Sequence, residues 1–122
     1  IQVLLASSAR DDAAAGPNVV AVRGVPSIAP LLAGAGVVVA SYGNLCFEAL
    51  ALGTPLCMLG QKPMQAAFAA RMAATGRAID GGLWSKTDPK TLSGAIERAR
   101  ALAVPPIDAG GLERIAALIW SR

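Results

Sequence analysis

The sequence predicts an α/β fold, a Rossmann-like parallel sheet of about five strands flanked by helices. Apolar residues make up 54% of the 122-residue chain and aromatic residues only 4%, a composition that suits buried parallel strands covered by helices rich in small residues. Short apolar runs alternate with helical patterns over short links, which favours parallel strands with right-handed crossovers. The length indicates one domain over residues 1–122.

Three strands and a short helix are expected in the first third of the chain. The strands are the apolar runs at residues 1–6, 18–22 and 37–40. Ser27 is placed to cap a short helix through Leu32. Because the sequence begins without Met, directly on a strand, we expect a fragment of a longer protein.

Two helices with a strand between them are expected in the central part of the chain. The first helix covers residues 45–52, and the apolar run 56–59 makes the strand that follows it. A further helix begins at residue 64 or 65 and stops at Gly76, a natural position for a glycine that ends a helix. The apolar residues that this helix is expected to bury are Phe68 and Met72.

A brief strand at residues 78–79 and two amphipathic helices are expected in the last third. The first helix opens at Asp88-Pro89 and has apolar residues at the i, i+3, i+4, i+7 spacing: Leu92, Ala95, Ile96 and Ala99. The second helix repeats the pattern at Leu112, Ile115, Ala116 and Ile119. We expect both helices to be structural cover for the sheet.

The composition argues against several classes of function. The net charge is only +3, and the eleven basic residues are scattered, so a nucleic-acid surface is not expected. Histidine is absent, which removes the commonest general base and the commonest metal ligand. Cys46 and Cys57 lack the spacing of metal ligands and are expected to be buried, reduced thiols of a cytoplasmic protein. We expect no metal site and no cofactor.

The most informative stretch is the strand, turn and helix over residues 36–55. The turn Tyr42-Gly43-Asn44 aims a helix N-terminus beyond the strand end, and the unpaired amides and dipole of such a terminus favour a phosphate. Glu48 lies one turn into the helix and is the sole charged residue between Arg23 and Lys62. Its carboxylate can lean back toward the same cleft, and a phosphate seat beside a hydroxyl acceptor suits a nucleotide-sugar.

Simpler explanations of the same residues stay open. Glu48 can merely stabilise the first turn of its helix. Gly43 can serve the turn alone, and Asn44 can cap the helix. Gln65 can be a solvated residue at a helix start.

A family resemblance extends over residues 25–76. It is carried by Val25-Pro26-Ser27, Ser41-Tyr42-Gly43-Asn44-Leu45-Cys46-Phe47-Glu48, Gly53-Thr54-Pro55, Gln65 and Gly76. Their spacing resembles the C-terminal, donor-binding domain of GT-B glycosyltransferases. The similar group contains the peptidoglycan N-acetylglucosaminyltransferase, the UDP-sugar hydrolase of pseudaminic acid synthesis and spore-coat polysaccharide enzymes. Residues 107–115 are similar to the tail of the hydrolase branch.

The resemblance implies half of a GT-B fold and a set of ligand contacts. The turn Tyr42, Gly43, Asn44 and Leu45 would hold the diphosphate through its backbone, and Glu48 would accept hydrogen bonds from the ribose. The loop at Gly24 and Val25 would contact the base, and Gln65 would reach the sugar or the phosphates. Leu45 stands where the family has a threonine, and Met64 stands where it has an acidic or amide residue. Backbone amides are therefore expected to do most of the binding.

The resemblance implies the donor-binding domain of a bacterial glycosyltransferase that uses a UDP-sugar in cell-surface polysaccharide or glycan synthesis. The C-terminal domain of a UDP-sugar hydrolase and a non-catalytic fold remnant that binds partners only are the alternatives. We expect no catalytic residue in this chain, which would be inactive without an N-terminal acceptor domain. The full enzyme could associate peripherally with a membrane, and uncovered sheet edges predict a homo-oligomer.

Overall fold

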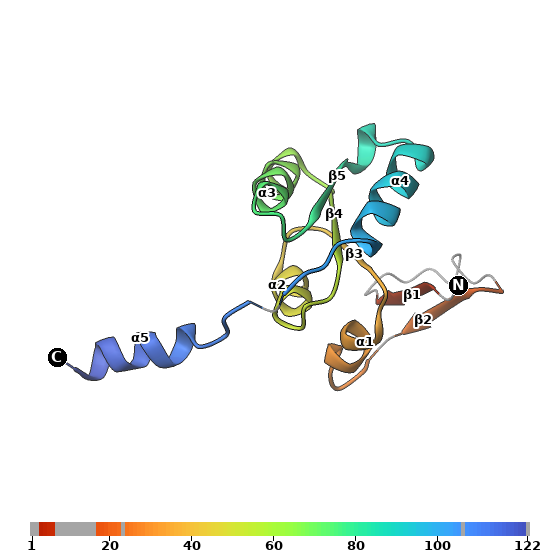
Figure 1. The fold of residues 1–122 in the computed structure, drawn as a ribbon. Helices are drawn as coiled ribbons and strands as arrows, with labels where there is room; N and C mark the ends of the chain where they lie inside the picture. The colour runs from red at the N-terminus through yellow and green to blue at the C-terminus, as the bar shows by residue number, and fades with distance from the viewer. Residues whose placement is uncertain (1–2, 7–16, 23, 106, 122) are drawn as a thin grey trace.

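The computed structural model describes residues 3–6, 17–22, 24–105 and 107–121. The strands in these ranges are β1 (Val3–Ala6), β2 (Val19–Val22), β3 (Val38–Ala40), β4 (Leu56–Gly60) and β5 (Ile79–Leu83). The helices are α1 (Ala29–Gly34), α2 (Asn44–Ala51), α3 (Pro63–Ala74), α4 (Pro89–Arg100) and α5 (Gly111–Trp120), with a 3₁₀ turn, η2 (Trp84–Lys86), after β5. Strands and helices alternate through most of the chain (Figure 1).

The α/β class is confirmed, with a three-stranded parallel sheet flanked by helices. Its strand order is β3-β4-β5, and Val38 pairs with Leu56 in the register of the first two strands. Strands β1 and β2 form a separate parallel pair. In the described ranges the expected single sheet of about five strands is therefore divided in two. Residues 1 and 2 of the expected first strand lie outside those ranges.

Strand β4 is the centre of the larger sheet, and all five of its residues are buried. Leu56 and Met58 belong to the apolar cluster that α2 and α3 help to form, whereas Cys57 packs with Ala95 and Ala99 of α4. Successive side chains of a strand point to opposite faces, so α2 and α3 cover one face and α4 covers the other. Figure 1 shows α3 and α4 on opposite sides of β4 and β5.

Helix α3 lies unusually close to the end of β4. A Cβ built on Gly60 would come within 2.6 Å of the Ala66 backbone nitrogen. The buried residue of this helix is Ala69, at 1% exposure, and Phe68 and Met72 are only half-buried. The expectation that the two large side chains would be the buried ones is wrong. A helix so close to the sheet leaves space for only a methyl group between them.

Several expected boundaries agree with the structure to within one residue. Helix α2 begins at Asn44, one residue before the expected start, and Gly76 has the left-handed φ of 73° expected where α3 ends. Asp88 caps α4 by accepting a hydrogen bond from the Thr91 amide. Ser27 is not the cap of α1, since Ile28 occupies that position, but its hydroxyl accepts a hydrogen bond from the Ala29 amide at 3.3 Å.

Helix α5 differs from the other helices because it extends away from the rest of the molecule (Figure 1). None of its residues is buried, and Leu112 and Trp120 are 75% and 85% exposed. The expectation that this helix covers the sheet is wrong. Among the described helices, none combines the length and the apolar character needed to cross a membrane.

Candidate functional site

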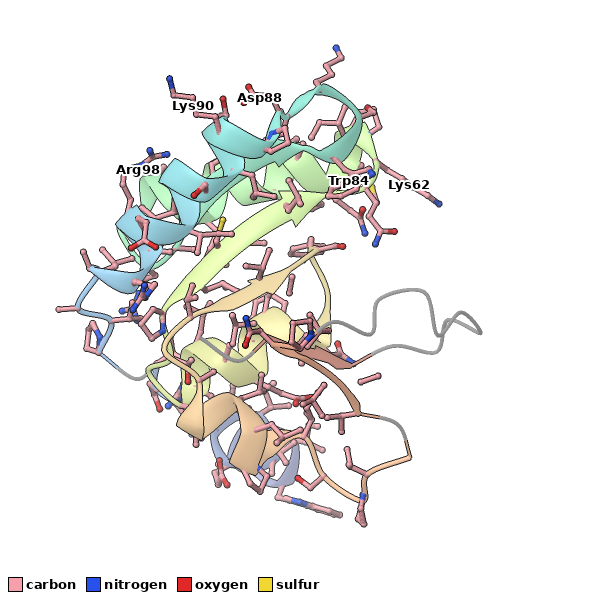
Figure 2. All side chains as sticks on the ribbon, turned by 90° about the vertical axis from the view of Figure 1, so that its right-hand side faces the viewer. Lys62, Trp84, Asp88, Lys90 and Arg98 are labelled. Atoms are coloured by element: carbon pink, nitrogen blue, oxygen red, sulfur yellow. The ribbon has the colours of Figure 1, made fainter. Side chains whose placement is uncertain are left out.

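A cavity of about 590 Å³ lies at the carboxyl ends of the strands in the larger sheet. Parallel sheets of α/β proteins place their ligands at this edge, and the volume is within the range of about 300–1,000 Å³ typical of small-molecule sites. Figure 2 shows Trp84 and Lys62 at the end of the molecule toward which the arrow of β4 points. The cavity is lined by Val39, Ala40, Ser41, Leu59, Gln61 and Trp84.

Ser41 connects this cavity to the start of α2. The residue that precedes the helix is Gly43, which has an extended backbone (φ 167°, ψ −174°) and makes no side-chain cap. The carbonyl of Gly43 accepts a hydrogen bond from the Cys46 amide at 3.0 Å. The carbonyl of Ser41 accepts a hydrogen bond from the Cys46 thiol, also at 3.0 Å. The first amides of α2 therefore begin without a side-chain acceptor, at the partly positive end of the helix.

The ring of Tyr42 is used in packing. It stacks on Phe68 of α3 with centroids 4.2 Å apart and planes 9° apart, and it meets Phe47 edge-on at 5.9 Å. The guanidinium of Arg71 lies 5.6 Å from the centre of the Phe68 ring on the same helix. This aromatic cluster fixes the turn before α2 against α3, so the backbone of Tyr42, rather than its ring, is left for a ligand.

Glu48 is exposed on α2, whose buried face carries Cys46, Ala49 and Leu50. It does not line the cavity, and neither does Asn44, which is also exposed. Leu45 is half-buried and packs against the core cluster. The structure therefore brings Ser41, and not the predicted acid, to the cavity wall.

Gln65 caps the helix on which it lies. Its side-chain oxygen Oε1 accepts hydrogen bonds from the backbone amides of Gln61, at 3.0 Å, and of Lys62, at 3.1 Å. This pair of bonds satisfies two donors at the start of α3 and holds Gln61 in place at the cavity. In this geometry Gln65 acts on the cavity through Gln61, and a direct contact with sugar or phosphate stays a prediction.

Gly24 and Val25 lie on the exposed link between β2 and α1. Gly24 has a left-handed φ of 62°, with open space around the position of a Cβ. Neither residue lines the cavity. Of the eight predicted ligand residues, the turn of Tyr42 to Leu45 continues directly from Ser41, and Gln65 bonds to Gln61. The structure shows no comparable link from the cavity to Glu48, Gly24 or Val25.

The six cavity residues were not predicted. Ser41 directly follows the predicted strand 37–40, and Gln61 lies two residues after the predicted strand 56–59. The rule that parallel strands end at one edge could therefore have identified both. Trp84 was missed for a different reason. The expected strand ended at residue 79, whereas β5 continues to Leu83 and places Trp84 at its end.

The described residues of the cavity and the two nearby thiols suit the binding of a ligand and not acid–base or nucleophilic catalysis. None of the six described residues that line the cavity is charged. Burial raises the pKa of the Cys46 thiol, although a backbone hydrogen bond at Gly43 opposes the change. Burial is also the main cause that raises the pKa of Cys57, which Arg98 lowers and Asp80 raises. Both thiols favour the neutral form and are poor nucleophiles.

Within the described residues no group of three His, Cys, Asp or Glu side chains could hold a metal ion. The site therefore consists of an uncharged cavity beside the uncapped start of a helix. Comparison with known proteins gave no match to a family model, to a curated protein or to a solved structure.

Proposed function

We propose that this chain is the UDP-sugar-binding domain of a GT-B-type glycosyltransferase that acts in cell-surface polysaccharide or glycan synthesis. The observation that carries the proposal is the continuity of Ser41, at the wall of the cavity, with the uncapped first turn of α2. A diphosphate at the amides after Gly43 would leave its substituent beside the cavity. The spacing of residues 25–76, which resembles donor-binding domains, supports a nucleotide-sugar as the ligand.

The proposed role in the reaction is electrostatic. Negative charge develops on the diphosphate when the bond to the anomeric carbon opens, and oriented amides at a helix start stabilise that charge. In this proposal Glu48, which is exposed on α2 outside the cavity, accepts hydrogen bonds from the ribose hydroxyls. The general base and the acceptor pocket belong to a second domain, so this chain binds the donor without turning it over.

Calorimetric titration with UDP tests the proposal. Two glycines that flank strand β3, one on each side, provide a test variant and its matched control. Gly43 and Gly36 both have open space around a Cβ, and neither has a left-handed φ that would strain an alanine. Gly43→Ala therefore leaves the fold intact but places a methyl group where the phosphate approaches the backbone. We expect UDP binding to weaken about tenfold, or about 1.4 kcal/mol. Gly36→Ala, at the other end of β3, is expected to leave the affinity unchanged.

A second pair of variants tests Glu48. Glu48→Ala removes the proposed acceptor, and hydrogen bonds to a charged group contribute about 1.5–3 kcal/mol, so we expect UDP to bind about 10- to 100-fold more weakly. Glu113→Ala is the control, because Glu113 is also an exposed glutamate on a helix. Equal affinity of wild type and Glu48→Ala would remove Glu48 from the site.

One observation favours the alternative of a non-catalytic, partner-binding fold. None of the eight predicted ligand residues lines the cavity, and the side chains of Tyr42 and Gln65 are used within the protein. The same titration separates the two functions. Absence of heat at millimolar UDP, together with indifference to Glu48→Ala, would favour the partner-binding fold.

A further inference from the structure

Trp84 is an exposed aromatic side chain on the wall of the cavity. It is 64% exposed, although tryptophan is among the side chains that gain most from burial. In the described part of the chain it forms no stack with another aromatic ring and no cation–π contact. Its indole is therefore available to a ligand in the cavity.

The backbone that carries Trp84 is held in a defined conformation. The Thr87 hydroxyl lies 3.0 Å from the Gly81 carbonyl and 2.9 Å from the Leu83 carbonyl, and the Thr87 amide donates to Leu83 at 2.9 Å. Gly82 has a positive φ of 83°, and a Cβ there would lie 2.7 Å from the Thr87 hydroxyl oxygen. These contacts fix the 3₁₀ turn that begins with Trp84, so the backbone that carries the indole is held in place before any ligand arrives.

The other side chains of the cavity match the two kinds of surface on a sugar ring. Val39, Ala40 and Leu59 are apolar, whereas Ser41 and Gln61 present a hydroxyl and a carboxamide. No hydrogen-bond partner for either polar group is found among the described residues. A pyranose has C–H faces that suit an aromatic ring and hydroxyls at its edge that suit such groups. The described lining residues carry no charge, and such a surface suits an uncharged sugar.

We infer that Trp84 is the ring on which the sugar of the donor stacks, with its hydroxyls directed to Ser41 and Gln61. This inference rests on the proposed function and deepens it, because it assigns the cavity to the glycosyl group and the start of α2 to the diphosphate. The ligand class is a nucleotide-sugar with an uncharged hexosyl or N-acetylhexosaminyl group.

Nuclear magnetic resonance of the two indole N–H groups tests the inference. The chain has two tryptophans, and Trp120 on α5 is 85% exposed and outside the cavity, so its signal is an internal control. The probes are UDP-N-acetylglucosamine, UDP and free N-acetylglucosamine. We expect the nucleotide-sugar and the free sugar to shift the Trp84 signal, UDP to shift it less, and the Trp120 signal to stay in place.

The amides of Gly43 to Leu45 report separately on the diphosphate. Shifts of these amides with UDP, but no additional shift of Trp84 with the nucleotide-sugar, would overturn the inference and leave the proposed function standing. No response of these amides to either nucleotide would overturn the proposed function. A Trp84 signal that no sugar-containing probe moves would overturn the inference in either case.

Substitution of Trp84 gives a second readout. Trp84→Ala should weaken the nucleotide-sugar about tenfold and change the affinity for UDP less than twofold, whereas Trp84→Phe keeps a ring and should restore most of the loss. Because the side chain is largely exposed, both variants are expected to fold. An equal loss of affinity for UDP and the nucleotide-sugar would show that Trp84 contacts the nucleotide instead, and would overturn the inference.

Discussion

Helices α4 and α5 have the same spacing of apolar residues but opposite surroundings. In α4, Ala95 and Ala99 are 1% and 0% exposed and pack against Cys57 of β4. In α5 no residue is buried, and Ile115 and Ile119 are 56% and 64% exposed. An apolar stripe therefore predicts that a helix forms, but not that the rest of the same chain covers it.

Side-chain size and capping distinguish the two helices. The buried positions of α4 are alanines, which let the helix lie close to a sheet, whereas the apolar stripe of α5 consists mainly of large side chains. Helix α4 begins with the Asp88 cap, and α5 begins at Gly110 with no side-chain cap. Both differences are visible in the sequence, and together they favour α4 as the helix that packs on the sheet.

The largest expected difference comes from adding volume to each helix. Ala99→Leu forces three extra carbons into a filled contact and should lower the free energy of unfolding by about 1–3 kcal/mol. Ala117→Leu on α5, where Ala117 is exposed, should change it by less than about 0.5 kcal/mol. Urea denaturation of both variants measures the difference. Equal destabilisation would show that α5 is packed in solution.

A smaller difference is expected when an isoleucine is shortened. Ile96 of α4 is half-buried against the cluster that contains Ala95, so Ile96→Ala should cost about 1–2 kcal/mol, somewhat less than a fully buried isoleucine. Ile115→Ala should stay within about 0.5 kcal/mol of wild type. The same denaturation experiment gives both values. Stabilisation that depends on protein concentration and is lost in Ile115→Ala would indicate contact between copies.

The smallest effect is expected from the Asp88 cap and depends on pH. Hydrogen bonds from the side chain and backbone of Thr91 lower the pKa of Asp88. The stabilisation is therefore present above the ordinary pKa of about 3.9 and is lost as the pH falls through the lower, folded-state pKa. Asp88→Asn should reduce the acid dependence of the melting temperature in this window. Asp108→Asn is the control, since Asp108 accepts the Gly110 amide before the unpacked α5; an equal effect of both changes would contradict the comparison.

The elements that were predicted best are those with a glycine or a proline at their ends. Helices α2 and α4 and strand β4 begin within one residue of the expected positions, and α3 begins one residue before the earlier of its two expected starts. Gly53, Pro55, Pro63 and Pro89 leave little freedom for these boundaries. The pairing of β1 with β2 apart from β3 could not be predicted, because strand patterns do not show which edges meet.

The sequence predicted the turn beside the candidate site but none of the six described residues that line its cavity. The turn before α2 was identified from the change from strand to helix pattern around Gly43. Trp84 follows Asp80-Gly81-Gly82, residues that rarely form strands. Here β5 continues through them because β4 pairs with it and Asp80 and Thr87 bond to its backbone. Such support comes from contacts that a local pattern does not record.

The attachment of Gln61 to α3 has a consequence for changing what the cavity accepts. Gly60 cannot take a side chain beside Ala66, and Gln65 holds the amides on both sides of the Gln61 carbonyl. This corner is thus tied to the helix, and substitution of Gly60 or Gln65 would disturb the fold as well as the lining. Altered selectivity is therefore easier to engineer at Ser41 and Trp84, whose side chains can be exchanged without dismantling the scaffold.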